Sequence, residues 1–449
     1  MPYPSRYGRR PQEYASKSSH GPIIQDPAVQ DFLKQCILPR KAEDIELGDY
    51  LQISYQPVEP NPIRYVIAID GGYTEVPVQE RFPSATIAFF QFGALFFDVE
   101  HLISLEHSSF IDPDDMAALK NIQRLKFTFP VKNVALRSEG SLLHSARKAI
   151  YDFFRQDMDG DEIMKTLRWL IFREYDKPRN HWTLANCPYC KESRIPLEVA
   201  KITPDYTFSC PHCGEPIYLT DVFRLHEWID DEVGAGSVLG YLTNVIEQIL
   251  FAHLVRIVLK IKPELMNELL IIRDGPLAFF GPTARLHQPF RELAAYLFSS
   301  HNLFLAGLEK TGAFVEHADE IFPLLEPGKA LVLDNEYIYK YIIPGQGDPL
   351  RPYGSTSYYG NKLIFKAPTG HIYVATLPTI PEAGQEAIAF PTEKDFTNLQ
   401  TIFTNIALLY CDMYDNALVP VALANKLVSL SNHPSSRILQ RFVKETMQP

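Results

Sequence analysis

The stretch YVIAIDGGYTEVP, Tyr65–Pro77, joins an apolar run to an abrupt Asp70-Gly71-Gly72. Its first six residues predict a buried β-strand that ends in a carboxylate. The same arrangement returns in ELLIIRDGPLAFFG, where the apolar run Leu269–Arg273 ends at Asp274 and Gly275. Each Asp-Gly pair is also an ordinary turn sequence. The sequence therefore poses the question whether these are two separate turns or two halves of one site.

The segments between the two pairs predict an α/β fold. Two further strands, SATIAFFQF (84–92) and ALFFDVEHL (94–102), follow the first, with Gly93 as a tight hairpin between them. A long apolar helix over 237–260 precedes the second Asp strand, and a helix near 289–300 and a strand over 302–308 come after it. This order is that of an RNase H-like mixed sheet flanked by helices, in which the first and fourth strands are neighbours. We therefore expect Asp70 and Asp274 to meet at adjoining strand ends.

The same reading divides the chain into three parts. Residues 1–60 are predicted to form an N-terminal arm and helix. Residues 61–145 and 231–449 are predicted to form one discontinuous RNase H-like domain, which includes two more strand candidates, KLIFKAP and HIYVATLP. Residues 146–230 are predicted to be a helical insertion that carries a zinc ribbon.

The composition of the 449-residue chain is that of a globular protein, with 46% hydrophobic and 22% charged residues. The net charge of −11 argues against simple wrapping of nucleic acid on a basic surface. We expect no apolar run long enough to span a bilayer and no secretory signal, and hence a cytoplasmic protein. In such a chain the six cysteines argue for metal or free thiols rather than a disulfide framework.

Four of the cysteines form two close pairs, Cys187 and Cys190 in CPYC and Cys210 and Cys213 in CPHC. The 19 residues between the pairs (210 − 190 − 1) match the spacing of a four-thiolate zinc site. Two disulfides or a redox pair are the alternatives. Four closed thiolates leave no open position, so the zinc would be structural. We expect zinc loss to unfold residues 186–220, because no other core is evident there.

The two strand-end aspartates suit the hydrolysis of a phosphodiester bond. Paired Mg²⁺ or Mn²⁺ ions activate water and stabilise the leaving oxygen, and they require carboxylate oxygens. A third acid would be Glu247, the only acidic residue between Glu232 and Glu264 and part of an apolar helix; it either serves the site or faces solvent. Lys310, just past a strand, either contacts phosphate as a point charge or is an exposed cation.

These motifs together, IAIDGG, a helix with a lone Glu, IIRDGPL and LAGLEKTG, resemble the NurA family of nucleases. The resemblance implies a DNA end-processing nuclease with an RNase H-like fold and Mn²⁺ or Mg²⁺ as cofactor. It also implies a homodimer that docks on a hexameric HerA-type ATPase and acts in DNA repair or antiviral defence. By position it makes Asp70, Glu247 and Asp274 metal ligands, and it makes Lys310 the family's lysine.

Near its C-terminus the family shows a Tyr and, eleven residues on, a His. This sequence has Tyr414 and Asn425 at that spacing (425 − 414). Asn can offer an oxygen to a metal, but it cannot act as a general base.

Two rival hypotheses remain open. One is another enzyme on the same fold, such as an RNase H-like ribonuclease or a resolvase. The other is a zinc-bearing DNA-binding or scaffold subunit whose site is weakened, which the Asn425 departure favours.

Overall fold

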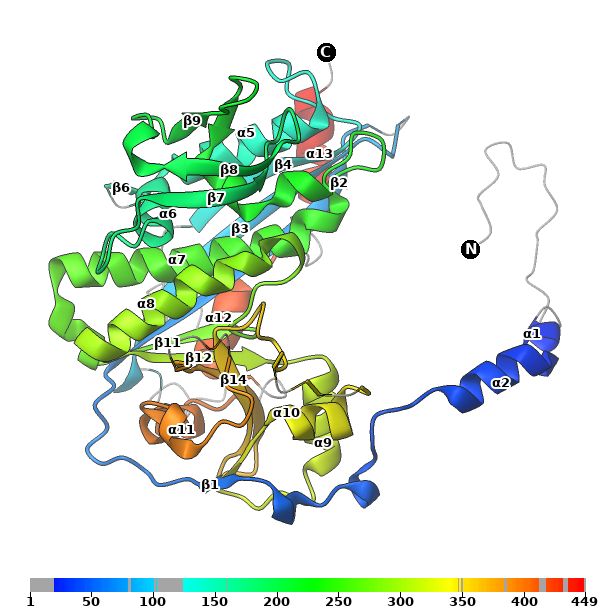
Figure 1. Cartoon of the computed structure of the whole chain (residues 1–449), viewed down its shortest axis with the longest axis vertical. Helices are drawn as coiled ribbons and strands as arrows, with labels where there is room; N and C mark the ends of the chain where they lie inside the picture. Colours follow the sequence, from blue (N-terminus) through cyan, green and yellow to red (C-terminus); the bar gives the residue numbers. More distant parts are fainter. Residues whose placement is uncertain are drawn as a thin grey trace.

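The computed structural model describes residues 20–79, 82–100, 102, 124–158, 160–345, 347–348, 350–382, 385, 387–411, 417–430 and 435–447. A nine-stranded mixed sheet in the order β1-β13-β14-β15-β12-β11-β2-β3-β4 runs through the molecule (Figure 1). Its strands are β1 (Gln52–Ser54), β2 (Tyr65–Pro77), β3 (Thr86–Asp98), β4 (Arg124–Lys132), β11 (Leu269–Asp274), β12 (Phe304–Glu309), β13 (Lys329–Val332), β14 (Gly360–Lys366) and β15 (Ile372–Pro378). The predicted α/β class with a mixed sheet flanked by helices is confirmed.

The centre of the sheet contains the predicted pairing of the two Asp strands. β2 pairs with β3 in antiparallel fashion and with β11 in parallel, and Ile67 of β2 lies opposite Ile271 of β11. β12 then adds in parallel on the other side of β11. The first and fourth core strands are therefore neighbours, as the sequence predicted. The RNase H-like name itself stays a prediction.

Two details of the first strands differ from the prediction. β2 does not end at Asp70 but continues to Pro77. Gly93 is not a hairpin: it lies within β3, opposite Asp70, and the third strand of the domain is β4. Gly93 serves close packing instead, because a Cβ there would lie 2.9 Å from Cγ1 of Val428.

Helices cover both faces of the sheet. One face packs against α5 (Leu142–Phe154), α6 (Ile163–Ile171), α7 (Leu239–Ile261) and α8 (His287–Ser300), and the other against α11 (Leu399–Leu408) and α12 (Val419–Val428). The alternation of apolar residues explains this, because Ile67 and Ile69 of β2 point to the first face, whereas Val66 and Ala68 point to the second. α9 (Ala313–Ile321) packs on β15, and α13 (Ser435–Met447) packs beside the far end of the β2–β3 hairpin.

The N-terminal helices lie apart from this body. α1 (Gly21–Gln25) and α2 (Pro27–Gln35) have no buried residue and extend away from the sheet (Figure 1). Asp26 begins α2, and its side chain accepts a hydrogen bond from the amide of Ala28.

The expectation that no apolar run is long enough to span a bilayer was wrong. The segment Gly236–Ile261, which contains α7, is long and apolar enough to cross a membrane by length and composition. In this structure 61% of its most apolar window is buried inside the protein, which is the behaviour of a core helix. α7 packs between the sheet and the other helices of its face, so its apolarity has a sufficient cause in the core.

The turn after β11 packs against Gly307 of β12, a residue without a side chain. Gly275, with φ of 107°, turns the chain after Asp274, and its amide donates to the carbonyl of Leu308 at 2.6 Å. A Cβ on Gly307 would lie 2.5 Å from the Gly275 oxygen and 2.9 Å from the Leu277 nitrogen. Glycine at 307 therefore lets the turn that follows Asp274 lie directly against β12.

We predict that Gly307→Ala lowers the free energy of unfolding by about 1–3 kcal/mol, because the new methyl group meets backbone that cannot swing away. Denaturant unfolding measures the change. Gly240→Ala is the matched control: Gly240 lies in α7, and a Cβ there would have nothing within 4 Å, so helix propensity should raise stability by about 0.5–1 kcal/mol. Equal stability of Gly307→Ala and the unchanged protein would contradict this account of the turn.

Candidate functional site

Asp70 and Asp274 occupy matching positions on adjacent parallel strands. The β2–β11 ladder runs through Ile69 opposite Arg273, and the two aspartates come next. Adjacent strands lie about 4.8 Å apart. Ala68 and Ile272, two residues before each aspartate, both belong to the core under α11 and α12. By the alternation of strands, both aspartates therefore point to that same face of the sheet.

Asp70 is a buried acid with an unused oxygen. Its side chain is 5% exposed, and Oδ1 accepts a hydrogen bond from the amide of Gly71 at 2.8 Å. Oδ2 is buried and has no hydrogen-bond partner within the described residues. Burial and, after it, the negative charge of Asp274 raise the pKa of Asp70 to about 7. Because a buried charge is unfavourable unless it is paired, an ionised Asp70 would be stabilised by a cation.

Asp274 already has a cationic partner in the same structure. The ammonium of Lys310, which follows β12, donates to Oδ2 of Asp274 at 2.7 Å. The Lys310 side chain is 26% exposed, so it reaches solvent as well as the acid. The structure therefore places Lys310 beside Asp274, close enough for its charge to act on Asp70 as well.

Glu247 approaches from the other face of the sheet. It lies on α7, is 6% exposed, and its Oε1 would be 3.2 Å from a Cβ on Gly71. The missing side chain at Gly71 thus leaves room for the carboxylate beside β2. Burial raises the pKa of Glu247 to about 8. The positive charge of Arg273 lowers this pKa, whereas the negative charges of Asp70 and Asp274 raise it further. The alternative that Glu247 faces solvent is wrong.

Sequence reasoning missed Arg273, which directly precedes Asp274 in β11 and pairs with Glu247 of α7. Its side chain is buried, and Nη2 lies 3.2 Å from Oε2 of Glu247 and donates to Oδ1 of Asn244. Nη1 donates to the carbonyl of Pro276. The available signal was a lone arginine inside LLIIRD, a strand that is otherwise buried on both faces.

The acids suit a hard divalent cation, because they offer carboxylate oxygens and one buried oxygen without a partner. Their oxygens do not converge on one point in this structure. Among the residues that the structure describes, the only preformed group of three or more His, Cys, Asp or Glu ligands is the four cysteines. Asp274 and Glu247 are instead paired with Lys310 and Arg273. Coordination of one ion by all three acids would therefore require side chains to rotate.

The two C-terminal candidates are not placed at the acids. Tyr414 lies outside the described residues. Asn425 is exposed on α12, one turn before Val428, whose side chain packs over Gly93, the partner of Asp70 in the β2–β3 ladder. The end of α12 thus lies at the site, but within the described part of the chain the Asn425 amide has no hydrogen bond to the acids.

The four cysteine sulfurs converge as the spacing predicted. Their Sγ atoms lie within 4.8 Å of one another, and the Cys187–Cys213 and Cys190–Cys210 pairs are each 3.8 Å apart. A tetrahedron with Zn–S bonds of about 2.3 Å has edges near this length. All four are free thiols, which argues against the disulfide alternative. The group suits a metal ion, and its identity as structural zinc stays a prediction.

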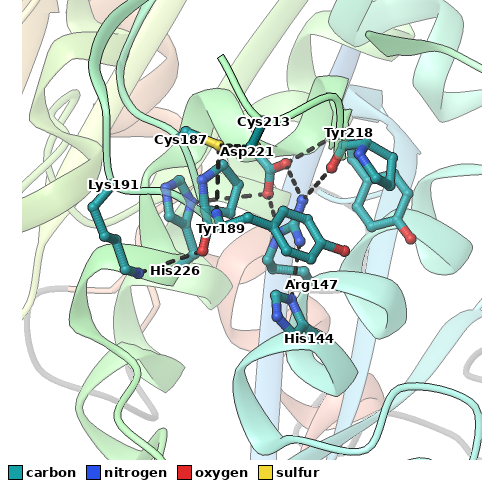
Figure 2. A network of polar contacts seen from close by, with 11 residues as sticks. His144, Arg147, Cys187, Tyr189, Lys191, Cys213, Tyr218, Asp221 and His226 are labelled. Carbon is teal, nitrogen blue, oxygen red and sulfur yellow. Dashed lines mark hydrogen bonds and ion pairs between the residues drawn. The ribbon is translucent and has the colours of Figure 1, made fainter. Parts of the chain in front are cut away.

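A buried arginine connects residues 186–220, here called the cysteine module, to the rest of the protein (Figure 2). Arg147 of α5 makes two hydrogen bonds to Asp221, at 2.9 and 2.8 Å, and both side chains are almost fully buried. The guanidinium lies 4.8 Å from the ring centroid of Tyr189, in the first cysteine knuckle, and 5.0 Å from that of Tyr218.

The expectation that this module has no core besides the metal was wrong. Buried apolar residues of the module belong to the same cluster as α5, α7 and the sheet: Ile195, Leu197, Phe208, Ile217 and Leu219. Metal loss should therefore loosen the two knuckles rather than unfold all of residues 186–220.

Comparison with known proteins found likeness only at the level of structure. No family model and no curated protein sequence matches this chain. The chain is similar to the NurA nuclease from Sulfolobus solfataricus, with 9% identity, a TM-score of 0.35, and coverage of 96% of this chain and 95% of the other.

Two further solved structures show a similar degree of likeness. One is NurA, with 10% identity, a TM-score of 0.28, and 97% and 99% coverage. The other is NurA with manganese, with 11% identity, a TM-score of 0.29, and 96% and 99% coverage. These are structures of the family that the sequence motifs resemble.

Asp70 predicts a pH dependence of stability. Its pKa of about 7 in the folded protein exceeds the ordinary 3.8, so the folded state binds the proton more tightly, and stability falls as pH rises from about 3.8 to 7. Between pH 6 and 8 the unchanged protein should lose about 1.4 kcal/mol more than Asp70→Asn. Denaturant unfolding with Zn²⁺ retained and Mg²⁺ and Mn²⁺ omitted tests this, and parallel pH profiles would contradict it.

The cysteine group predicts a local effect of metal loss. Cys187→Ser should abolish the binding of one Zn²⁺ per chain and expose the two knuckles to protease, because it removes a buried ligand. Far-ultraviolet circular dichroism should change little, since the module shares the body's core. Cys36→Ser, at an exposed cysteine outside the group, is the control and should keep its zinc. Full zinc content in Cys187→Ser would refute the assignment.

Proposed function

We propose that this chain is a divalent-cation-dependent nuclease that hydrolyses phosphodiester bonds in DNA. The observation that carries the proposal is Asp70, a buried acid with an unpartnered oxygen next to Asp274 on the adjoining strand. Glu247 adds a third carboxylate across Gly71. This concentration of carboxyl groups favours the binding of Mg²⁺ or Mn²⁺.

In this proposal Asp70, Asp274 and Glu247 hold the cation. When bound, Mg²⁺ or Mn²⁺ supplies Lewis-acid stabilisation of charge on the phosphate and lowers the pKa of water. The acids must be ionised to bind it, so cation binding releases protons from Asp70 and Glu247 and strengthens as pH rises. Lys310 is half-buried and paired with Asp274. When Asp274 holds the cation, the Lys310 ammonium would be available to bind a phosphate oxygen instead.

The surroundings of the site are also part of the proposal. The net charge of −11 gives the chain little general attraction for DNA, so a partner would have to deliver the strand. The partners that the sequence resemblance implies are a HerA-type hexameric ATPase and a second copy of this chain, with which it would form a homodimer. We propose a cytoplasmic role in DNA repair or antiviral defence, with the four cysteines holding a structural Zn²⁺.

A second candidate function is a DNA-binding or scaffold subunit that does not hydrolyse DNA. One observation favours it: Lys310 and Arg273 form ion pairs with two of the three acids. The exposed Asn425 adds no general base to the site. Cleavage assays separate the two functions, because a scaffold would bind DNA and leave it intact.

The test is cleavage of linear duplex and single-stranded DNA with Mn²⁺ or Mg²⁺. Asp70→Ala and Asp274→Ala should each lower the rate about a hundred-fold or more, because each removes a carboxylate that would hold the cation which stabilises charge on the phosphate. Asp152→Ala is the control, since Asp152 is a half-exposed acid of α5 that pairs with Lys148, and it should keep full activity.

Three results would count against the proposal. Wild-type cleavage by Asp70→Ala and Asp274→Ala would remove the site assignment. Binding of DNA without cleavage by the unchanged protein would favour the scaffold function. Faster cleavage of RNA than of DNA would favour the ribonuclease alternative.

A further inference from the structure

Arg273 is an uncommon residue for its position. It lies in β11, which has β2 on one side and β12 on the other, and the four residues before it in the strand, Leu269–Ile272, are buried and apolar. Its own side chain is 7% exposed, and Nε is buried without a hydrogen-bond partner within the described residues. Burying a cation costs free energy unless it is paired. A charge kept in the centre of the sheet therefore indicates a use for it.

The guanidinium connects three elements through its two terminal nitrogens. Nη2 contacts Glu247 and Asn244, which are one turn apart on α7, and Nη1 binds the carbonyl of Pro276 in the turn after Asp274. The planar fork of arginine fixes the directions of these contacts, which the point charge of lysine does not.

A second layer of hydrogen bonds holds the same arrangement. Nε2 of Gln248 donates to Oδ1 of Asn244 at 3.0 Å and to the carbonyl of Ala278 at 2.9 Å. Oε1 of Gln248 accepts from the hydroxyl of Tyr359 at 2.8 Å. α7 is thereby tied to the segment after β11 at Ala278, in addition to the connection through Arg273 to Pro276.

This geometry divides the work of the Glu247 carboxylate. Oε2 faces Arg273 at 3.2 Å, whereas Oε1 lies against Gly71, the residue after Asp70. Glu247 can therefore present one oxygen toward β2 while the other is held. We propose that Arg273 is a positioning residue that fixes Glu247 so that it offers a single oxygen to the divalent cation. This inference rests on the proposed function, because it needs a cation bound by the acids.

The proposal makes a prediction of sign. If Arg273 only competed with the cation for Glu247, its removal would tighten cation binding, because one positive charge leaves the site. If Arg273 positions Glu247, its removal weakens cation binding, and the loss of such a supporting partner typically lowers metal affinity about 10–100-fold. The two roles thus predict opposite changes in the dissociation constant.

The experiment is a Mn²⁺ titration of the full chain, with the cysteine group first loaded with Zn²⁺, in which free Mn²⁺ is measured by electron paramagnetic resonance. Asp70→Asn identifies the signal of the acid site, because it should lose that binding. Arg273→Gln should raise the Mn²⁺ dissociation constant at least about ten-fold. Arg273→Lys, which keeps a charged donor for Glu247, should recover part of the loss.

Two further variants guard against misfolding. Asn244→Ala removes one contact of the guanidinium at a partly exposed position and should weaken Mn²⁺ binding in the same direction. Arg147→Gln breaks an equally buried arginine pair with Asp221, outside the acid site, and should lower thermal stability without changing Mn²⁺ affinity.

The outcomes are distinct. Weaker Mn²⁺ binding in Arg273→Gln and Asn244→Ala, with unchanged binding in Arg147→Gln, supports the proposal. Tighter binding in Arg273→Gln overturns it in favour of competition, and unchanged binding with a lower melting temperature overturns it in favour of a structural role. If the unchanged protein binds Mn²⁺ nowhere outside the cysteine group, the proposed function fails and this inference falls with it.

Discussion

The parallel pairing of β2 with β11 is the constraint on which the site depends. It brings together two strands that are about two hundred residues apart in the chain and sets Asp70 beside Asp274 on one face of the sheet. β11 turns away after Asp274, whereas β2 continues with only β3 as its partner. The two strands thus diverge directly after Asp70 and Asp274, and the acids lie at this point of divergence.

Asp70 and Glu247 are buried at this point and Asp274 is partly buried, so their negative charge has to be offset by positive charge. Lys310 supplies one such charge to Asp274, and Arg273 supplies another to Glu247, which leaves Asp70 without a cationic hydrogen-bond partner within the described residues. The two side-chain cations differ in exposure, because Lys310 reaches solvent and Arg273 does not. We therefore assign exchange with phosphate to Lys310 and fixed support to Arg273 in the proposed nuclease.

The sequence predicted the features that follow from local pattern and spacing. Apolar runs located β11, β12, β14 and β15, and the order of elements placed β2 beside β11. The spacing of the cysteines predicted their convergence. The pattern did not distinguish Gly93 in a strand from Gly93 in a turn, because the reason for that glycine is the distant Val428. Arg273 was missed for a similar cause, since its partners on α7 come together with it only in the fold.

The central claim is that Asp70 and its neighbours bind a divalent cation, and diffraction tests it most directly. Crystals of the full chain soaked in Mn²⁺, measured on both sides of the manganese absorption edge, would locate the ion by its anomalous signal. This account predicts a peak about 2.1 Å from Oδ2 of Asp70, with Asp274 turned away from Lys310 toward the ion. Manganese found elsewhere, with Asp70 left bare and the Lys310–Asp274 pair intact, would contradict it.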